Sequence, residues 1–274
     1  VGAFTVATGA FETAGLDNEG TITLTVNKSK FTLTGEGKNA GSIAFGNAAS
    51  TFKVGSESVL SNVYGATVGS ATETTNGKLV IDGAVNNLGK IGVNDIEVNG
   101  LLDNQTAKPT SGEQKGEIRA ATVKITKDGV LNAGATYDVG ATNVYGTFNA
   151  LELNATVGES EKANALTIIH GITLNEGAKL NAAGAAVQNV VLGKTENSTG
   201  TAGTLTIASG SFDFDTVENK YTGSAFTVKD GSATVKELTT IADTKVTVGA
   251  VTAATGALTV TDKLTSVAGS VDVY

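Results

Sequence analysis

His170 is the only histidine, and it lies in the apolar segment Thr167–Ile172. A histidine here could act as a general base or as a metal ligand. Because the chain has no cysteine and no second histidine, a metal site at His170 would need carboxylates as all its other ligands. We therefore interpret His170 as the end of an apolar strand beside the corner glycine Gly171.

The most compact acidic pair is Asp213 and Asp215, in the segment Phe212-Asp213-Phe214-Asp215. On a β-strand the two carboxylates point to one face, and Phe212 and Phe214 point to the other. Two outward carboxylates, helped by loop carbonyl oxygens, could bind calcium. The alternative is a solvated strand face that covers two buried phenylalanines. Asp213 and Asp215 are therefore the metal candidates, and calcium is the candidate ion.

Arg119 is the only arginine, in the segment Glu117–Ala120. A lone arginine is more typical of a surface ion pair than of a catalytic centre. The sequence also has no Gly-x-Ser-x-Gly motif, the turn that presents a catalytic serine in many hydrolases. We predict that the chain is not an enzyme and holds no organic cofactor.

The elements that must position these residues are β-strands. The 274 residues include 35 glycines and are rich in threonine and valine, which favour pleated, half-buried surfaces with glycine at the corners.

The net charge of −8, with scattered lysines, disfavours nucleic acid and anionic membranes as partners. No apolar stretch approaches the roughly 18–20 residues of a membrane span.

Corner signals alternate with short amphipathic strands along the chain. Asn18-Glu19-Gly20 precedes Thr21–Val26, in which Ile22 and Leu24 would face inward and the threonines outward. In the C-terminal half, similar strands follow Gly177, Gly203, Gly231 and Gly256. A period of roughly 20–30 residues with several strands inside it is typical of a β-solenoid coil.

We therefore predict one elongated all-β solenoid domain over residues 1–274, with stacked aliphatic side chains inside. The alternative is two or more antiparallel β-sandwich domains with a boundary near Pro109. The polar segment 103–116 would then be a linker, whereas in a solenoid it is a long loop. The absence of tryptophan and the aromatic content of 5% favour the solenoid, because sandwich cores usually carry large aromatic residues.

The segments Gly20–Leu24, Gly177–Ala182 and Gly203–Ile207 resemble the right-handed parallel β-helix passengers of bacterial autotransporters and filamentous haemagglutinin-type adhesins. The acidic, sulfur-free composition with lysine in excess of arginine resembles that of bacterial S-layer proteins. These resemblances imply a right-handed parallel β-helix, an extracellular location at the cell surface, and a role in adhesion or coat formation.

Two function classes follow. The first is a non-enzymatic structural protein, such as an adhesin stalk, an S-layer subunit or a self-assembling filament, whose partners are copies of itself or neighbouring segments of a longer chain, and glycans of a host or cell surface. The second is a carbohydrate-active β-helix enzyme, a polysaccharide lyase or hydrolase. An enzyme should bring several carboxylates, with or without a lysine or arginine, together in one groove.

Overall fold

The computed structural model describes residues 3–7, 9–25, 27–70, 76–104, 106–107, 114–133, 136–150, 165–168, 171–182, 185–196, 199–219, 221–241, 243–249, 256–266 and 269–273. Within these ranges all regular structure is β-strand, and most strand pairs are parallel. The predicted all-β parallel solenoid is confirmed, and the antiparallel sandwich alternative is not. Antiparallel pairing within the described ranges occurs in three short hairpins.

The chain divides into two compact units. The first comprises Val1–Gly140 and Gly146–Leu151, and the second comprises Ala141–Tyr145 and Glu152–Tyr274. The division does not fall near Pro109, a residue that lies outside the described ranges.

Short strands build the first unit. They are β1 (Ala3–Val6), β2 (Ala10–Asn18), β3 (Thr21–Leu24), β4 (Lys30–Asn39), β5 (Ser42–Phe45), β6 (Thr51–Val54), β7 (Val59–Asn62), β8 (Thr67–Gly69), β9 (Lys78–Ile81), β10 (Ala84–Asn87), β11 (Lys90–Val98), β12 (Leu101–Asn104), β13 (Thr106–Ala107), β14 (Gln114–Lys115), β15 (Glu117–Ile125), β16 (Val130–Ala133) and β18 (Thr147–Ala150), with β17 (Thr136–Val144) reaching into the second unit.

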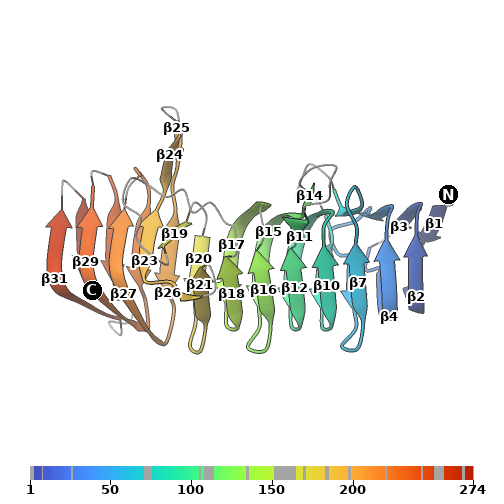
Figure 1. Cartoon of the computed structure of the whole chain (residues 1–274), viewed down its shortest axis with the longest axis horizontal. Helices are drawn as coiled ribbons and strands as arrows, with labels where there is room; N and C mark the ends of the chain where they lie inside the picture. The colour runs from blue at the N-terminus through green and yellow to red at the C-terminus, as the bar shows by residue number, and fades with distance from the viewer. Residues whose placement is uncertain are drawn as a thin grey trace. The chain divides into compact units, whose positions relative to one another are not determined.

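These strands form three parallel stacks, and each coil of the chain passes through the stacks in the same order. The first stack runs through β1, β3, β5, β8 and the first half of β11. The second runs through the first halves of β2 and β4, then β6, β9 and the second half of β11. The third runs through the second halves of β2 and β4, then β7, β10, β12, β16 and β18 (Figure 1).

A coil can be as short as 17 residues, the separation between Asn87 and its register partner Asn104. It fits because its corners are minimal. A single residue, Asn94, joins the two halves of β11, and Asn99-Gly100 leads into β12. At Gly100 an added Cβ would lie 2.0 Å from the carbonyl oxygen of Gly83 in the preceding coil, so the corner requires glycine.

The second unit is built in the same way. Its strands are β19 (Ala165–Ile168), β20 (Gly171–Leu174), β21 (Lys179–Ala182), β22 (Ala185–Ala186), β23 (Asn189–Leu192), β24 (Lys194–Glu196), β25 (Thr199–Thr201), β26 (Thr204–Ile207), β27 (Ser211–Asn219), β28 (Ala225–Val228), β29 (Ser232–Thr240), β30 (Lys245–Val248), β31 (Ala257–Ser266) and β32 (Ser270–Val273). One stack runs from the end of β17 through β20, β26, β28, β30 and β32. Another runs from β19 and β23 through β27, β29 and β31.

Side chains alternate between the interior and the surface, as the sequence pattern predicts. Ile22 and Leu24 are buried while Thr21 is exposed. In β27, Phe214 is buried and Asp213 is exposed. The strand predicted over Thr21–Val26 is β3, which ends at Leu24, and Val26 lies outside the described residues.

We predicted a purely aliphatic interior, and this is wrong in two respects. The first is that phenylalanine rings also stack there. Phe11, Phe31 and Phe52 occupy equivalent positions in three successive coils. Their rings stack with centroid separations of 5.5 and 5.2 Å. Stacking of like residues follows from the parallel in-register pairing, which places each side chain over its counterpart one coil away.

The second departure is a buried asparagine ladder. The last residue of five successive third-stack strands is an asparagine with almost no exposed surface. Each side chain donates from Nδ2 to the Oδ1 of the next, over 2.7 or 2.8 Å. The ladder consists of Asn18, Asn39, Asn62, Asn87 and Asn104.

Every ladder residue also binds the backbone at a corner. The second N–H of Asn39 donates to the carbonyl oxygen of Thr67, which begins the first-stack strand after Asn62. Asn62 makes the same contact with Lys90. The ladder therefore also joins third-stack strands to first-stack strands through backbone carbonyl oxygens. It ends at Asn104, because the residue that follows Asn132 in the next strand is Ala133.

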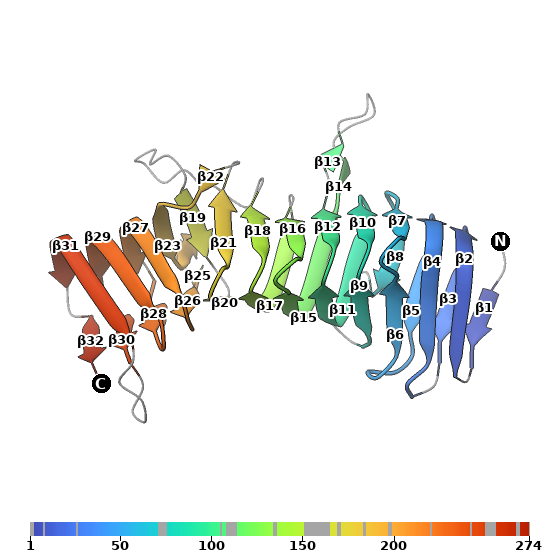
Figure 2. The ribbon, with the colours of Figure 1, turned by 90° about the horizontal axis from the view of Figure 1, so that it is seen from below.

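The polar segment 103–116 is an excursion from one corner of the first unit. It leaves the coil after Asn104 and returns at Gly116, and the short hairpin of β13 and β14 stands on it (Figure 2). Asn104 Nδ2 donates to the carbonyl oxygen of Gly116 over 3.1 Å, so a hydrogen bond joins the two ends of the excursion. Segment 103–116 is therefore a long loop of the solenoid, as expected, and its two ends are held together.

Candidate functional site

Two ion pairs of the first unit lie on the outward face of its second stack, and we call this face the charged face. Its residues come from the strands and the corners that follow them, where alternation points every second side chain to the solvent. The paired and hydrogen-bonded members are Lys53, Lys78, Asp82, Asp95, Glu97 and Asn99.

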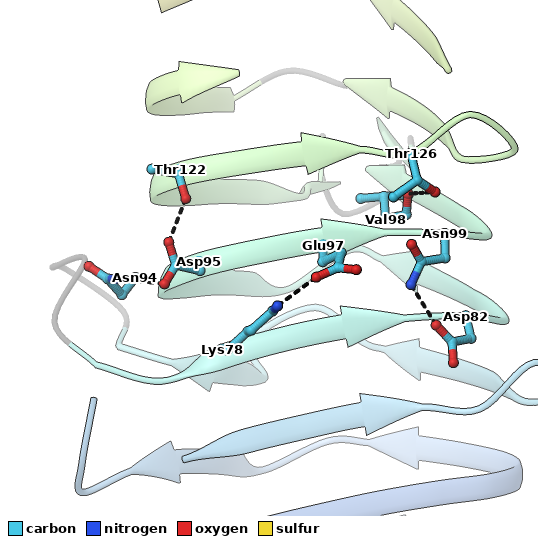
Figure 3. A network of polar contacts seen from close by, with 9 residues as sticks. All are labelled: Lys78, Asp82, Asn94, Asp95, Glu97, Val98, Asn99, Thr122 and Thr126. Carbon is cyan, nitrogen blue, oxygen red and sulfur yellow. Dashed lines mark hydrogen bonds and ion pairs between the residues drawn. The ribbon is translucent and has the colours of Figure 1, made fainter. Parts of the chain in front are cut away.

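Two ion pairs on the charged face join successive coils. Lys78 Nζ lies 2.5 Å from Glu97 Oε2, between β9 and β11 (Figure 3). Lys53 Nζ lies 2.5 Å from Asp82 Oδ2, between β6 and the corner after β9. Because the coils are in register, each pair spans one strand spacing, about 4.8 Å.

Each carboxylate oxygen of Asp82 has a partner in a neighbouring coil. Its other oxygen, Oδ1, accepts a hydrogen bond of 2.6 Å from Asn99 Nδ2, in the corner of the next coil (Figure 3). Burial opposes ionisation, but the hydrogen bonds from Lys53 and Asn99 outweigh it and lower the pKa of Asp82. Three successive coils are thus linked through one carboxylate.

Glu97 is also fixed in its ionised form. The hydrogen bond from Lys78 lowers the pKa of Glu97 and exceeds the opposing effect of burial. A general acid would need a pKa raised toward the working pH, and both carboxylates are shifted the other way. Asp82 and Glu97 are therefore suited to linking coils and unsuited to donating protons.

A groove of about 400 Å³ lies at the N-terminal end of the charged face. Glu12, Lys30 and Glu57 line it together with the Lys53–Asp82 pair. Among the described residues, Glu12, Lys30 and Glu57 form no ion pair. Thr34 and Ser58 also line the groove, and their hydroxyl groups donate to backbone carbonyl oxygens of neighbouring coils. The groove can therefore offer a polar ligand the carboxylates of Glu12 and Glu57 and the ammonium group of Lys30.

Asp213 and Asp215, the predicted calcium ligands, lie outward on β27 as expected, with Phe214 buried on the other side. Asp213 is exposed, and Asp215 Oδ1 lies 2.6 Å from Lys236 Nζ on β29. In the described part of the chain no three acidic or histidine side chains gather as metal ligands. The pair remains a prediction, with a lysine in contact with one of its two carboxylates.

Arg119 and His170 are the two other sequence candidates. Arg119 lies on β15, with Nη2 3.9 Å from Glu117 Oε2, an ion pair of the kind expected for a lone surface arginine. His170 lies outside the described residues. The groove residues Glu12, Lys30 and Glu57 were not singled out from the sequence, because the three positions are far apart in the chain and meet only through coil register.

Comparison of the chain with models of known protein families gave no match, and neither did comparison with curated proteins or with solved structures. Across the described ranges, no helix has the length and apolar character required to cross a membrane. A function must therefore be inferred from the geometry of the coils and their faces.

Proposed function

We propose that this chain is a non-enzymatic structural protein of a bacterial cell surface, such as an adhesin stalk, an S-layer subunit or a self-assembling filament or coat subunit. The observation that carries the proposal is the use of polar groups between coils. Asp82 and Glu97 are ionised and paired across the strand spacing, and the asparagine ladder pairs amides through the interior. These groups stabilise the stack by linking successive coils.

Growth by strand pairing supports an assembling role. Open β edges are templates for further strands. In the last coil of the second unit, Leu264 and Val273 are exposed although they continue inward positions. In the first coil of the first unit, Phe4 and Phe11 are half-exposed for the same reason. The partners we infer are copies of the chain or neighbouring segments of a longer one, with surface glycans on the outward faces and calcium at Asp213 and Asp215.

Electron microscopy of the purified chain tests this role. We expect ordered fibres or sheets at high protein concentration, with calcium added or removed to test the Asp213–Asp215 site. Phe4→Lys should disperse them, because it places a charge on an apolar edge. Tyr64→Lys, at an exposed position in a turn, is the matched control and should assemble normally. Dispersed monomers in every condition would refute the assembling role.

One observation favours the second function class. The groove holds the carboxylates of Glu12 and Glu57 beside Lys30, the convergence expected of a carbohydrate-active enzyme. If the groove is catalytic, the chain should release unsaturated products or reducing ends from a panel of acidic and neutral polysaccharides. Glu12→Gln and Glu57→Gln should abolish this activity, whereas Glu36→Gln, on the outward side of the third stack, should not. No turnover of any polysaccharide would reject this class.

A further inference from the structure

The outward side of the third stack in the first unit, which we call the third-stack face, carries a row of aliphatic side chains. In an alternating strand with one solvated side, polar residues are expected at such positions. Here the strands β7, β10, β12 and β16 place in register Val59, Ala84, Leu101 and Val130. Val59 is 38% exposed, and the other three are half-buried. A contiguous apolar row on a solvent-facing sheet indicates an interaction surface, whereas scattered apolar residues do not.

A second row, of polar side chains, runs beside the aliphatic one. It lies two residues further along the same strands and consists of Ser61, Asn86, Asp103 and Asn132. Asn132 Nδ2 donates to Asp103 Oδ1 over 3.0 Å. Among the described residues the carboxamide of Asn86 makes no hydrogen bond. The row therefore contains one carboxylate and, one coil before it, a carboxamide whose donors are available.

The size of the third-stack face sets the strength of any contact there. Its four strands of four residues lie side by side in one sheet (Figure 1). With about 4.8 Å between strands and about 3.3 Å per residue, they present about 250 Å². Each partner of a stable complex contributes about 800 Å², so a partner that packs here binds weakly and reversibly.

We propose that the third-stack face packs on the same face of a second copy of this chain, about a two-fold axis that runs along the strands midway between β10 and β12. Contacts of this kind, in which both copies use the same patch, are the commonest in homo-oligomers. The inference rests on the proposed structural role, to which it adds a lateral contact that does not involve the coil edges.

The aliphatic row is complementary to itself about this axis. The rotation reverses the order of the coils and keeps the position along each strand, so the two sheets stay aligned, as packed sheets do. Ala84 then lies opposite the partner's Leu101, a small residue against a large one. Val59 lies opposite the partner's Val130. A two-fold axis along the stack would instead place the aliphatic row of one copy on the polar row of the other.

The polar row is complementary to itself about the same axis. The rotation places Asn86 opposite the partner's Asp103, and Asp103 opposite the partner's Asn86. A carboxylate accepts several hydrogen bonds, so Asp103 can keep its bond from Asn132 and accept one from the second copy. The two Asp103 side chains do not face each other, and no like charges are opposed in the row. This match of donors to acceptors favours a second copy as the occupant.

Sedimentation equilibrium of the full chain measures the contact. We expect monomers at about 10 µM and dimers at about 1 mM, in keeping with the small area. Leu101→Lys places an ammonium group in the aliphatic row and should raise the dissociation constant at least about tenfold. Val80→Lys is the matched control, because Val80 is a half-buried aliphatic residue on the outward side of β9, in the second stack. It should leave the dissociation constant unchanged.

Cross-linking tests the arrangement without a disruptive substitution. The chain has no cysteine, so an introduced cysteine is the sole thiol. A short bismaleimide should join chains in a mixture of the Val59→Cys and Val130→Cys variants, because these positions are opposed. Neither variant alone should be joined, since the rotation displaces each position from its own copy by three strand spacings, about 14 Å.

The outcomes separate this contact from the proposed structural role. Monomers at about 1 mM, equal effects of the two lysine variants, or cross-linking of either cysteine variant with itself would overturn the inference. These results would leave the structural role to the microscopy experiment, whose Phe4→Lys variant changes a coil edge and not this face. Conversely, the absence of fibres and sheets together with dimers that Leu101→Lys disrupts would refute the assembling role and support the contact.

Discussion

Removal of one carboxamide from the middle of the ladder tests the account of the interior most directly. Asn62 accepts from Asn39 Nδ2 over 2.8 Å, and it donates to Asn87 Oδ1 over 2.7 Å and to the Lys90 carbonyl oxygen over 3.3 Å. Asn62→Ala therefore removes the ladder partner of two buried polar groups, one N–H of Asn39 and the Oδ1 of Asn87. Each costs about 1–3 kcal/mol, so we expect the free energy of unfolding to fall by about 4 kcal/mol.

Urea unfolding followed by far-UV circular dichroism measures this loss, which should appear in the transition of the first unit. Asn132→Ala is the matched control. Asn132 also uses its amide in both directions, donating to Asp103 Oδ1 over 3.0 Å and accepting from Asn149 Nδ2 over 2.8 Å. Because it is outward and half-buried, water replaces its partners, and the loss should stay below about 1 kcal/mol. Equal losses in the two variants would refute the ladder's role.

Three further predictions concern other parts of the chain. Although burial opposes it, the pKa of Asp82 is lowered by Lys53 and Asn99, so its contribution is present above about pH 4 and is lost as pH falls through the folded-state pKa. Asp82→Asn should therefore weaken the fall of the urea midpoint in acid; an unchanged pH profile would contradict this. Replacement of residues 105–115 by one leucine should change the free energy of unfolding by less than about 1 kcal/mol, since it recreates the Leu88-Gly89 corner of the preceding coil; a loss of the cooperative transition would count against it. Thr240→Val should raise the free energy of unfolding by about 1 kcal/mol, because the buried Oγ1 has no partner among the described residues, whereas Thr216→Val should lower it, because Thr216 donates to Asn189; the opposite signs in thermal melts would disprove the assignment.

The sequence predicted the strand chemistry and the parallel solenoid, but not which strands pair. The step from Gly231 to Gly256 matches a real coil, since Ser232 is the register partner of Ala257. The step from Gly203 to Gly231 does not, because Thr204 pairs with Ala225, which comes before Gly231 in the chain. Glycine marks a corner without saying which corner of the coil it is, and loops of different lengths blur the period.

The asparagine ladder leaves a signal in the sequence, but the same signal has a second meaning. Asn18, Asn39, Asn62 and Asn87 recur at separations of 21, 23 and 25 residues, each at the end of a short alternating strand. Asparagine before a glycine or a small residue is also the usual mark of a turn, and the local sequence does not separate the two uses. Only the in-register stacking of the coils shows that these side chains point inward and meet each other.

The same stacking explains why the charged groups of the second stack could not be assigned in advance. Lys53, Asp82 and Asn99 are far apart in the sequence, and no fixed spacing relates them. They meet because the loops between them add length at corners without changing the register of the strands. A change in one corner therefore leaves the ladder and the ion pairs intact, as the hydrogen bond from Asn104 to Gly116 across the excursion indicates. Since the charged face is occupied in holding coils together, we expect binding functions that differ between chains of this design to lie in the corner excursions and on the other faces.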